Sequence, residues 1–302
     1  MNASWLWIPI VLFAAAAQTA RNAAQRSLIK TAGTLPATLV RFLYGLPFAL
    51  LAFGTARQIA AVDLPAPSLD FLAWIALGAM SQLVATAFLL MAMAQRSFIV
   101  AVAYSKTELL QIALYSIVLL GEALSGATAI AIAMATAGVL LLSLKGAKSK
   151  AQADSWWSPA AALGLACGAS FALSAVGYRG AALGLSQYPA WLVGTYSVAW
   201  AQAMQTVVLA GYLAIRDAEG LRKVIAQWRV SMLAGCTGAI ASCAWLTAFA
   251  MRNAADVRTV GLVEVIYGYA VSRRMYKEHV TGRELAGIAL VAGGIVVIGV
   301  AR

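Results

Sequence analysis

Apolar residues run along the whole chain in long segments, separated by short polar or charged breaks. A helix that crosses a bilayer needs about 20 mostly apolar residues. Cutting the chain at its charged and proline-containing breaks gives ten segments of suitable length. Because lipid offers the backbone no hydrogen-bond partners, such segments cross a membrane as helices. The expected spans are 5–24, 35–56, 71–94, 97–119, 124–144, 158–179, 189–215, 230–251, 256–274 and 283–301.

Composition places the protein in a membrane. The 302 residues are 62% hydrophobic and only 11% charged, which leaves too few ionisable side chains to cover a water-soluble domain. A formal net charge of +11 is compatible with nucleic-acid binding in principle. However, no basic run alternates with aromatic residues in a polar domain, as a nucleic-acid interface requires. We therefore expect an all-α integral membrane protein with membrane lipid around it and no nucleic-acid partner.

Residue types that carry enzyme or cofactor chemistry form no recognisable motif in this sequence. Cys167, Cys236 and Cys243 all lie within apolar segments, and the one histidine, His279, lies in a basic loop. Metal centres and catalytic sites need such residues at matched spacing. We expect no enzymatic activity, no cofactor and no metal.

Basic residues indicate the orientation of the chain. Most of the 22 Lys and Arg residues fall in the loops after the odd-numbered spans. Cytoplasmic loops carry the excess of positive charge in membrane proteins. The pattern therefore predicts a multi-pass protein of the bacterial inner membrane with both termini in the periplasm.

An internal repeat relates the two halves of the sequence. At an offset of 156 residues, the stretch 92–138 aligns with 248–294 and pairs Glu108 with Glu264. A second glutamate pair falls on the same offset without a gap, although the chain has only 11 acidic residues. Internal repeats of this kind are common in secondary transporters.

The repeat divides the chain into two domains of five helices each. A polar linker at 145–155 separates them, so the expected domains are 1–150 and 151–302. Because five is an odd number, the second half must insert upside down relative to the first. We predict ten transmembrane helices, arranged as two inverted five-helix repeats around a central cavity.

Short motifs at matching places in the two halves carry a family resemblance. They are Leu-Val-Arg-Phe at 39–42, Gly-Glu at 121–122 and Gly-Val-Leu-Leu-Leu at 138–142, with a second copy in Lys-Glu at 277–278 and Gly-Gly-Ile-Val-Val at 293–297. In these motifs and in its helix number the chain resembles the drug/metabolite transporter superfamily, specifically the ten-helix EamA-type members. The resemblance implies a secondary transporter with a cavity between its halves, in a family that often exports amino acids or other small metabolites.

Two glutamates inside predicted helices are the strongest candidates for function. An ionised side chain at the bilayer centre costs about 2.5–3.5 kcal/mol on insertion scales, so it should face a cavity or a partner. Tyr104, Glu108 and Gln111 share one helix face, and Glu264 and Tyr267 occupy the equivalent places in the second half. Either glutamate could carry a proton or bind a cationic substrate group. The alternative is that each carboxylate is paired with a neighbouring cation and serves packing.

Further polar residues inside the spans are candidates for substrate binding. Lys106 and Arg41 suit an anionic group, although Lys106 could instead neutralise Glu108, and Arg41 could lie at the membrane interface. Gln18 and Asn22 recur at helical spacing and are expected to line the cavity or its mouth.

Aromatic and small residues inside the spans have less specific roles. Tyr196 and Trp245 could form cavity walls that stack against a substrate, or they could belong to the packed core. Gly164, Gly168, Gly177 and Gly287 are suited to close contacts between helices.

These features favour a transporter, either an exporter or an exchanger, that moves a small polar metabolite such as an amino acid or amine by alternating access. Protons on Glu108 or Glu264 would supply the coupling. The alternatives are a flippase for a lipid or lipid-linked intermediate and, with less support, an integral-membrane enzyme. The sequence does not distinguish a monomer from a homodimer.

Overall fold

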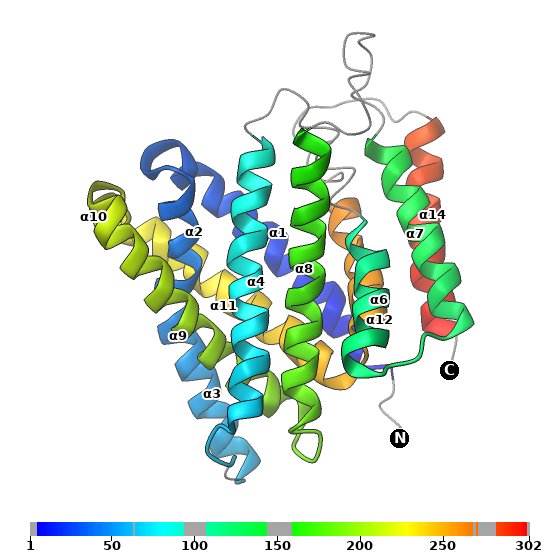
Figure 1. Cartoon of the computed structure of the whole chain (residues 1–302), viewed down its shortest axis with the longest axis horizontal. Helices are drawn as coiled ribbons and strands as arrows, with labels where there is room; N and C mark the ends of the chain where they lie inside the picture. The colour runs from blue at the N-terminus through cyan, green and yellow to red at the C-terminus, as the bar shows by residue number, and fades with distance from the viewer. Residues whose placement is uncertain are drawn as a thin grey trace. The chain divides into compact units, whose positions relative to one another are not determined.

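The computed structural model describes residues 5–62, 64–93, 107–143, 159–267, 270 and 282–300. Helices dominate these ranges, and no strand occurs within them (Figure 1). The prediction of an all-α protein is therefore confirmed for the described part of the chain.

A helix overlaps each of the ten predicted apolar segments. In chain order the helices are α1 (Trp7–Ala32), α2 (Thr34–Leu43), α3 (Leu46–Ala60), α4 (Leu69–Met93), α6 (Glu108–Leu120), α7 (Gly126–Ser143), α8 (Pro159–Leu183), α9 (Ala190–Arg216), α10 (Ala218–Ala226), α11 (Trp228–Met251), α12 (Ala254–Gly261) and α14 (Gly282–Val300).

Four stretches of the described chain are long and apolar enough to cross a membrane: Thr34–Ala60, Leu69–Phe88, Ala190–Arg216 and Trp228–Met251. Shorter apolar helices cover Glu108–Leu120, Gly126–Leu141 and Leu285–Val300. Several long apolar helices are what a multi-pass membrane protein requires. Crossing by all ten segments, and the inverted repeat, stay predictions.

The second predicted span is divided at Tyr44 and Gly45 into α2 and α3. Pro47 stands in the first turn of α3. Proline has no backbone N–H and disfavours helical conformation in the residue before it, so it favours a helix start at this point. Gly45, which has no side chain, therefore lies at a break within a stretch that is long and apolar enough to cross a membrane.

One helix lies where the sequence analysis expected a loop. In α10, Val224 is buried while Lys223 and Glu219 form an exposed ion pair with an N–O distance of 2.7 Å. The hydrogen bond to Glu219 raises the pKa of Lys223. Asp217 caps the helix by accepting a hydrogen bond from the Gly220 N–H at 2.9 Å. A helix this short and amphipathic cannot cross a bilayer, and a search for long apolar segments does not detect it.

The chain forms two compact units. Unit 1 comprises Met1–Met80 and Gly177–Arg252, and unit 2 comprises Ser81–Val176 and Asn253–Arg302. Each unit therefore combines residues from both halves of the sequence, and α4 and α8 contribute to both units. Units are defined by contacts and the predicted domains by a sequence repeat, so the division into 1–150 and 151–302 stays a prediction.

In unit 1, α1 and α9 pack along α11, and α3 packs on α9. Small residues allow the closest approaches. A Cβ atom at Gly194 of α9 would lie 2.6 Å from the Thr247 backbone N of α11, and one at Gly177 would lie 2.7 Å from the Gly78 N. The predicted close contact at Gly177 is confirmed, because nothing larger than hydrogen fits there.

In unit 2, α7 and α14 run side by side (Figure 1). A Cβ atom at Gly138 of α7 would lie 2.6 Å from the Gly287 carbonyl oxygen of α14. At the other contact, a Cβ atom at Gly294 would lie 2.9 Å from the Ala131 carbonyl oxygen. The predicted close contact at Gly287 is thus confirmed. Helix α12 packs against both helices of this pair and also against α6.

We expect Gly138→Ala to lower the midpoint of thermal unfolding in detergent, because the added methyl group would collide with the backbone of α14. Gly211→Ala is the matched control, since a Cβ atom there meets nothing within 4 Å. Its midpoint should be unchanged or raised, because alanine favours a helix more than glycine does. Equal midpoints for the two variants would contradict the close packing of α7 and α14.

Candidate functional site

A buried ion pair joins α6 and α12 in unit 2. The Arg258 Nε–H donates to Glu108 Oε1 at 2.9 Å, and Arg258 Nη2 lies 2.7 Å from the same oxygen. The Glu108 and Arg258 side chains are 10% and 18% exposed. Burial of both partners means that each charge depends on the other for compensation.

Local helix geometry favours both charges at these positions. Glu108 lies in the first turn of α6, directly after a turn at Thr107, and Arg258 lies in the last turn of α12, which ends at a turn at Leu262. Helix dipoles stabilise negative charge at the N-terminus and positive charge at the C-terminus. The two helix ends therefore stabilise the ion pair that they carry.

Glu264 is the third member of this group. It lies half-buried among the helical residues 263–267 that follow the turn at Leu262, and its carboxylate interacts electrostatically with Arg258. We call Glu108, Arg258 and Glu264 the Arg258 cluster. It sets two carboxyl groups against one guanidinium, so Arg258 can neutralise only one of these glutamates fully at a time.

The equivalent positions of the two glutamates are also alike in local structure. At the offset of 156, Thr107 corresponds to Val263, one residue after the turn at Leu262. In both halves of the sequence a turn thus comes just before the glutamate.

A hydrogen-bond network fixes the start of α12. Thr128 Oγ1 donates to Asp256 Oδ1 at 2.7 Å, and the Asp256 N–H donates to Asn253 Oδ1 at 2.8 Å. Asp256 is 1% exposed. Its carboxylate lies in the first turn of α12 and bonds to the first turn of α7, where helix dipoles favour negative charge. The network holds α12 two residues before Arg258 and so positions the cation.

Unit 1 contains buried polar groups of different chemistry. Gln202 and Gln205 of α9 are buried, and Gln205 Nε2 donates to the Ala79 carbonyl oxygen at 3.1 Å. Arg41 of α2 is half-buried and interacts electrostatically with Tyr178. These residues give unit 1 a polar interior in which the charged group is a cation.

Two predicted residues meet in unit 1. Trp245 Nε1 of α11 donates to Gln18 Oε1 of α1 at 3.1 Å. Their mutual contact puts both side chains in the interior of unit 1 and satisfies the indole N–H. Tyr196, in contrast, packs in an aromatic group with Phe53, Phe71 and Trp200, and its hydroxyl donates to a backbone carbonyl at 3.4 Å.

Of the other residues predicted for the site, some lie outside the described structure and others lie near the two glutamates. Tyr104 and Lys106 lie outside the described residues, as does the side chain of Asn22. Gln111 Nε2 donates to Thr107 Oγ1 at 3.1 Å, beside Glu108, and Tyr267 is half-buried, one turn after Glu264.

Sequence reasoning missed Arg258 as a site residue. Its position near a predicted helix end suggested a loop cation. The available signal was that it lies within the predicted span 256–274, only six residues before Glu264. A cation that shares an apolar segment with a carboxylate should have been considered as a partner for acidic residues elsewhere in the bundle.

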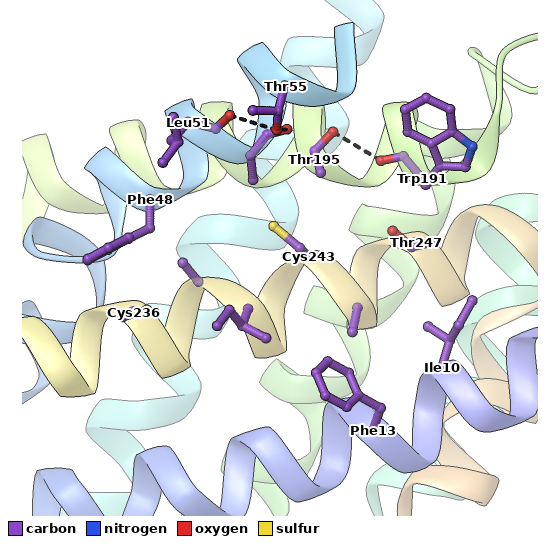
Figure 2. A pocket seen from close by; sticks show the side chains of 14 residues that line it. Ile10, Phe13, Phe48, Leu51, Thr55, Trp191, Thr195, Cys236, Cys243 and Thr247 are labelled. Atoms are coloured by element: carbon purple, nitrogen blue, oxygen red, sulfur yellow. Dashed lines mark hydrogen bonds between the residues drawn. The ribbon is translucent and has the colours of Figure 1, made fainter. Parts of the chain in front are cut away.

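An apolar pocket of about 570 Å³ lies in unit 1 between α1, α3, α9 and α11 (Figure 2). Two of its three threonine hydroxyls bond within their own helices: Thr55 Oγ1 donates to the Leu51 carbonyl and Thr195 Oγ1 to the Trp191 carbonyl, each at 3.0 Å. The surface offered to a ligand is therefore mostly hydrocarbon, with Cys236 and Cys243 on the α11 side. The lining residues are Ile10, Phe13, Phe48, Leu51, Ala52, Thr55, Trp191, Thr195, Cys236, Ala239, Ile240, Cys243, Ala244 and Thr247.

Comparison with known proteins identifies a similar fold. No family model and no curated protein matches the chain. A solved structure described as "Crystal structure of protein" is similar over 97% of this chain and 99% of its own, with a TM-score of 0.66 and 17% sequence identity. At this identity the likeness extends to the fold of the whole chain and carries no information on activity.

The Arg258 cluster makes a prediction about stability. Removing one partner of a buried ion pair leaves an uncompensated charge, which typically costs about 3–5 kcal/mol. We therefore expect Glu108→Leu and Arg258→Met each to lower the thermal unfolding midpoint strongly, and the double variant to recover part of the loss. The midpoint of each variant in detergent completes a double-mutant cycle.

The exposed pair Glu219 and Lys223 is the control, because surface ion pairs contribute little. Glu219→Leu and Lys223→Met should leave the midpoint unchanged. Strictly additive losses for Glu108→Leu and Arg258→Met would mean that the two side chains do not depend on each other.

Proposed function

We propose that the protein is a secondary transporter that moves a small polar metabolite, such as an amino acid or amine, by alternating access. The observation that carries the proposal is the buried Arg258 cluster, which lies beside the turns at Thr107 and Leu262. Charged residues within apolar bundles often mark a substrate pathway, a proton relay or a ligand site. The resemblance of the sequence motifs to EamA-type transporters supports the same function.

The ratio of charges in the cluster suggests how transport is coupled. Glu108 is bonded directly to Arg258, whereas Glu264 is half-buried and interacts with the same guanidinium electrostatically. A proton or the ammonium group of a substrate would neutralise Glu264. Because Arg258 bonds Glu108 directly, Glu264 is the better candidate for the group that exchanges its proton or ligand.

Coupling requires that the neutralising group bind the two conformations of a transporter differently. A ligand shifts a conformational equilibrium only by its difference in affinity for the two states. A change in which carboxylate Arg258 contacts would provide that difference. The turn at Leu262, which lies between Arg258 and Glu264, is suited to such a change, since small movements at a helix break redirect side chains.

The proposal includes a location. The excess of basic residues in alternate loops favours the bacterial inner membrane, with both termini in the periplasm. Substrate direction, export or exchange, follows from coupling and not from orientation alone.

A lipid or lipid-linked intermediate is a second candidate substrate, favoured by the apolar pocket of unit 1. A volume of about 570 Å³ lined by hydrocarbon suits an acyl or isoprenoid chain. Movement of a fluorescent phospholipid between the leaflets of proteoliposomes would distinguish this function. Flipping that is abolished by Cys243→Trp, which fills the pocket, would favour a lipid substrate over a soluble one.

Proteoliposome uptake tests the proposed transport. With a labelled amino acid mixture and an imposed pH gradient, we expect wild-type uptake to depend on the gradient. Glu264→Gln should remove this dependence while it preserves the pair between Glu108 and Arg258. Glu219→Gln, which neutralises an exposed carboxylate, should behave as wild type.

Two outcomes would count against parts of the proposal. Uptake with an unchanged pH dependence in Glu264→Gln would exclude this residue as the proton carrier. Failure of the wild-type protein to move any amino acid or amine, by uptake or by exchange, would contradict transport of this substrate class.

A further inference from the structure

Gln202 of α9 is a buried polar group whose hydrogen bonding is incomplete. The residue is 3% exposed, and its Oε1 has no hydrogen-bond partner among the described residues. Thr206, one helical turn further along α9, is also buried, and its Oγ1 likewise lacks a partner there. An amide oxygen removed from water costs free energy unless a donor reaches it. This oxygen is therefore ready to accept a hydrogen bond.

The Gln202 amide lies against the break between α2 and α3. A Cβ atom at Gly45 would be 2.9 Å from Gln202 Oε1 and 3.2 Å from Nε2. The same Cβ atom would collide with the Arg41 carbonyl oxygen. Only glycine fits at position 45, and its lack of a side chain keeps the amide next to the last turn of α2.

Arg41 supplies a cation to the same region. It lies in the last turn of α2, four residues before Gly45, with its guanidinium carbon 4.7 Å from the centre of the Phe42 ring. Tyr178 interacts with it electrostatically. Among the described residues no carboxylate forms an ion pair with Arg41. A guanidinium within an apolar bundle favours an anionic partner, and its planar set of donors fits a carboxylate.

A second arginine passes the same part of α11. A Cβ atom at Gly238 of α11 would lie 3.2 Å from Arg21 Cδ and 3.6 Å from Arg41 Cβ. The aliphatic parts of both arginines therefore pass over the same glycine.

We propose that Arg41 and Gln202 form a substrate subsite for a metabolite that carries a carboxylate next to a hydrogen-bond donor. The Arg41 guanidinium binds the carboxylate, and Gln202 Oε1 accepts the N–H or O–H. This inference rests on the proposed transport function and narrows its substrate class to amino or hydroxy acids, which excludes simple amines.

Ligand binding to the purified, full-length protein in detergent tests the subsite. Each of the twenty amino acids is used as a probe, and the thermal unfolding midpoint is titrated to obtain an affinity. The best probe is then compared with its C-terminal amide, which lacks the carboxylate, and with its deaminated acid, which lacks the donor. We expect both analogues to bind wild type about tenfold or more weakly.

The variants connect each half of the ligand to one residue. Arg41→Gln should lower the affinity for the amino acid and make it equal to the affinity for the amide. Arg41→Lys should retain part of the preference for the free carboxylate. Gln202→Ala should bind the amino acid and its deaminated acid with equal affinity. Arg57→Gln and Gln58→Ala, which alter exposed residues of α3, should leave both preferences intact.

Several results would overturn the subsite. They are equal affinity for the amino acid and its amide in wild type, full discrimination in Arg41→Gln, or no stabilisation by any of the twenty probes. Because transport is measured separately, pH-dependent uptake of an amine combined with any of these results would refute the subsite and leave the proposed transport function in place.

Discussion

The cost of placing charge inside an apolar helical bundle is the constraint on which the rest of this structure depends. In unit 2 it is met by a direct bond between Arg258 and Glu108, by the nearby carboxylate of Glu264, and by helix ends whose dipoles match each charge. None of these three effects alone would compensate the desolvation. Their combination fixes where α6 and α12 begin and end relative to each other.

Breaks in helices provide the polar groups with their positions. The turns at Thr107 and Leu262 adjoin the Arg258 cluster, and the break at Gly45 adjoins Gln202. A continuous apolar helix would direct every backbone group into its own hydrogen bonds and leave only side chains for chemistry. At Gly45 the absence of a side chain leaves room for the Gln202 amide.

The two units differ in the sign of the charge that they bury. In the described residues of unit 2, carboxylates outnumber the single guanidinium of the Arg258 cluster, whereas the polar interior of unit 1 contains Arg21 and Arg41. Each unit therefore favours a different ligand group: a proton or ammonium in unit 2 and a carboxylate in unit 1. The proton or ammonium site proposed in unit 2 and the carboxylate subsite proposed in unit 1 each follow from the charge within that unit.

The sequence by itself determined the helical class and the succession of long apolar helices, and it marked Glu108 and Glu264 as candidates, because hydropathy and helical period are local properties of the chain. Only the tertiary structure decided that Arg258, 150 residues away, bonds Glu108, and that Gln202 faces Gly45. Which helices pair depends on close contacts between small residues, such as Gly138 with Gly287, that are distant in sequence. Such contacts leave no periodic signal, since alanine and glycine occur throughout a chain of this composition.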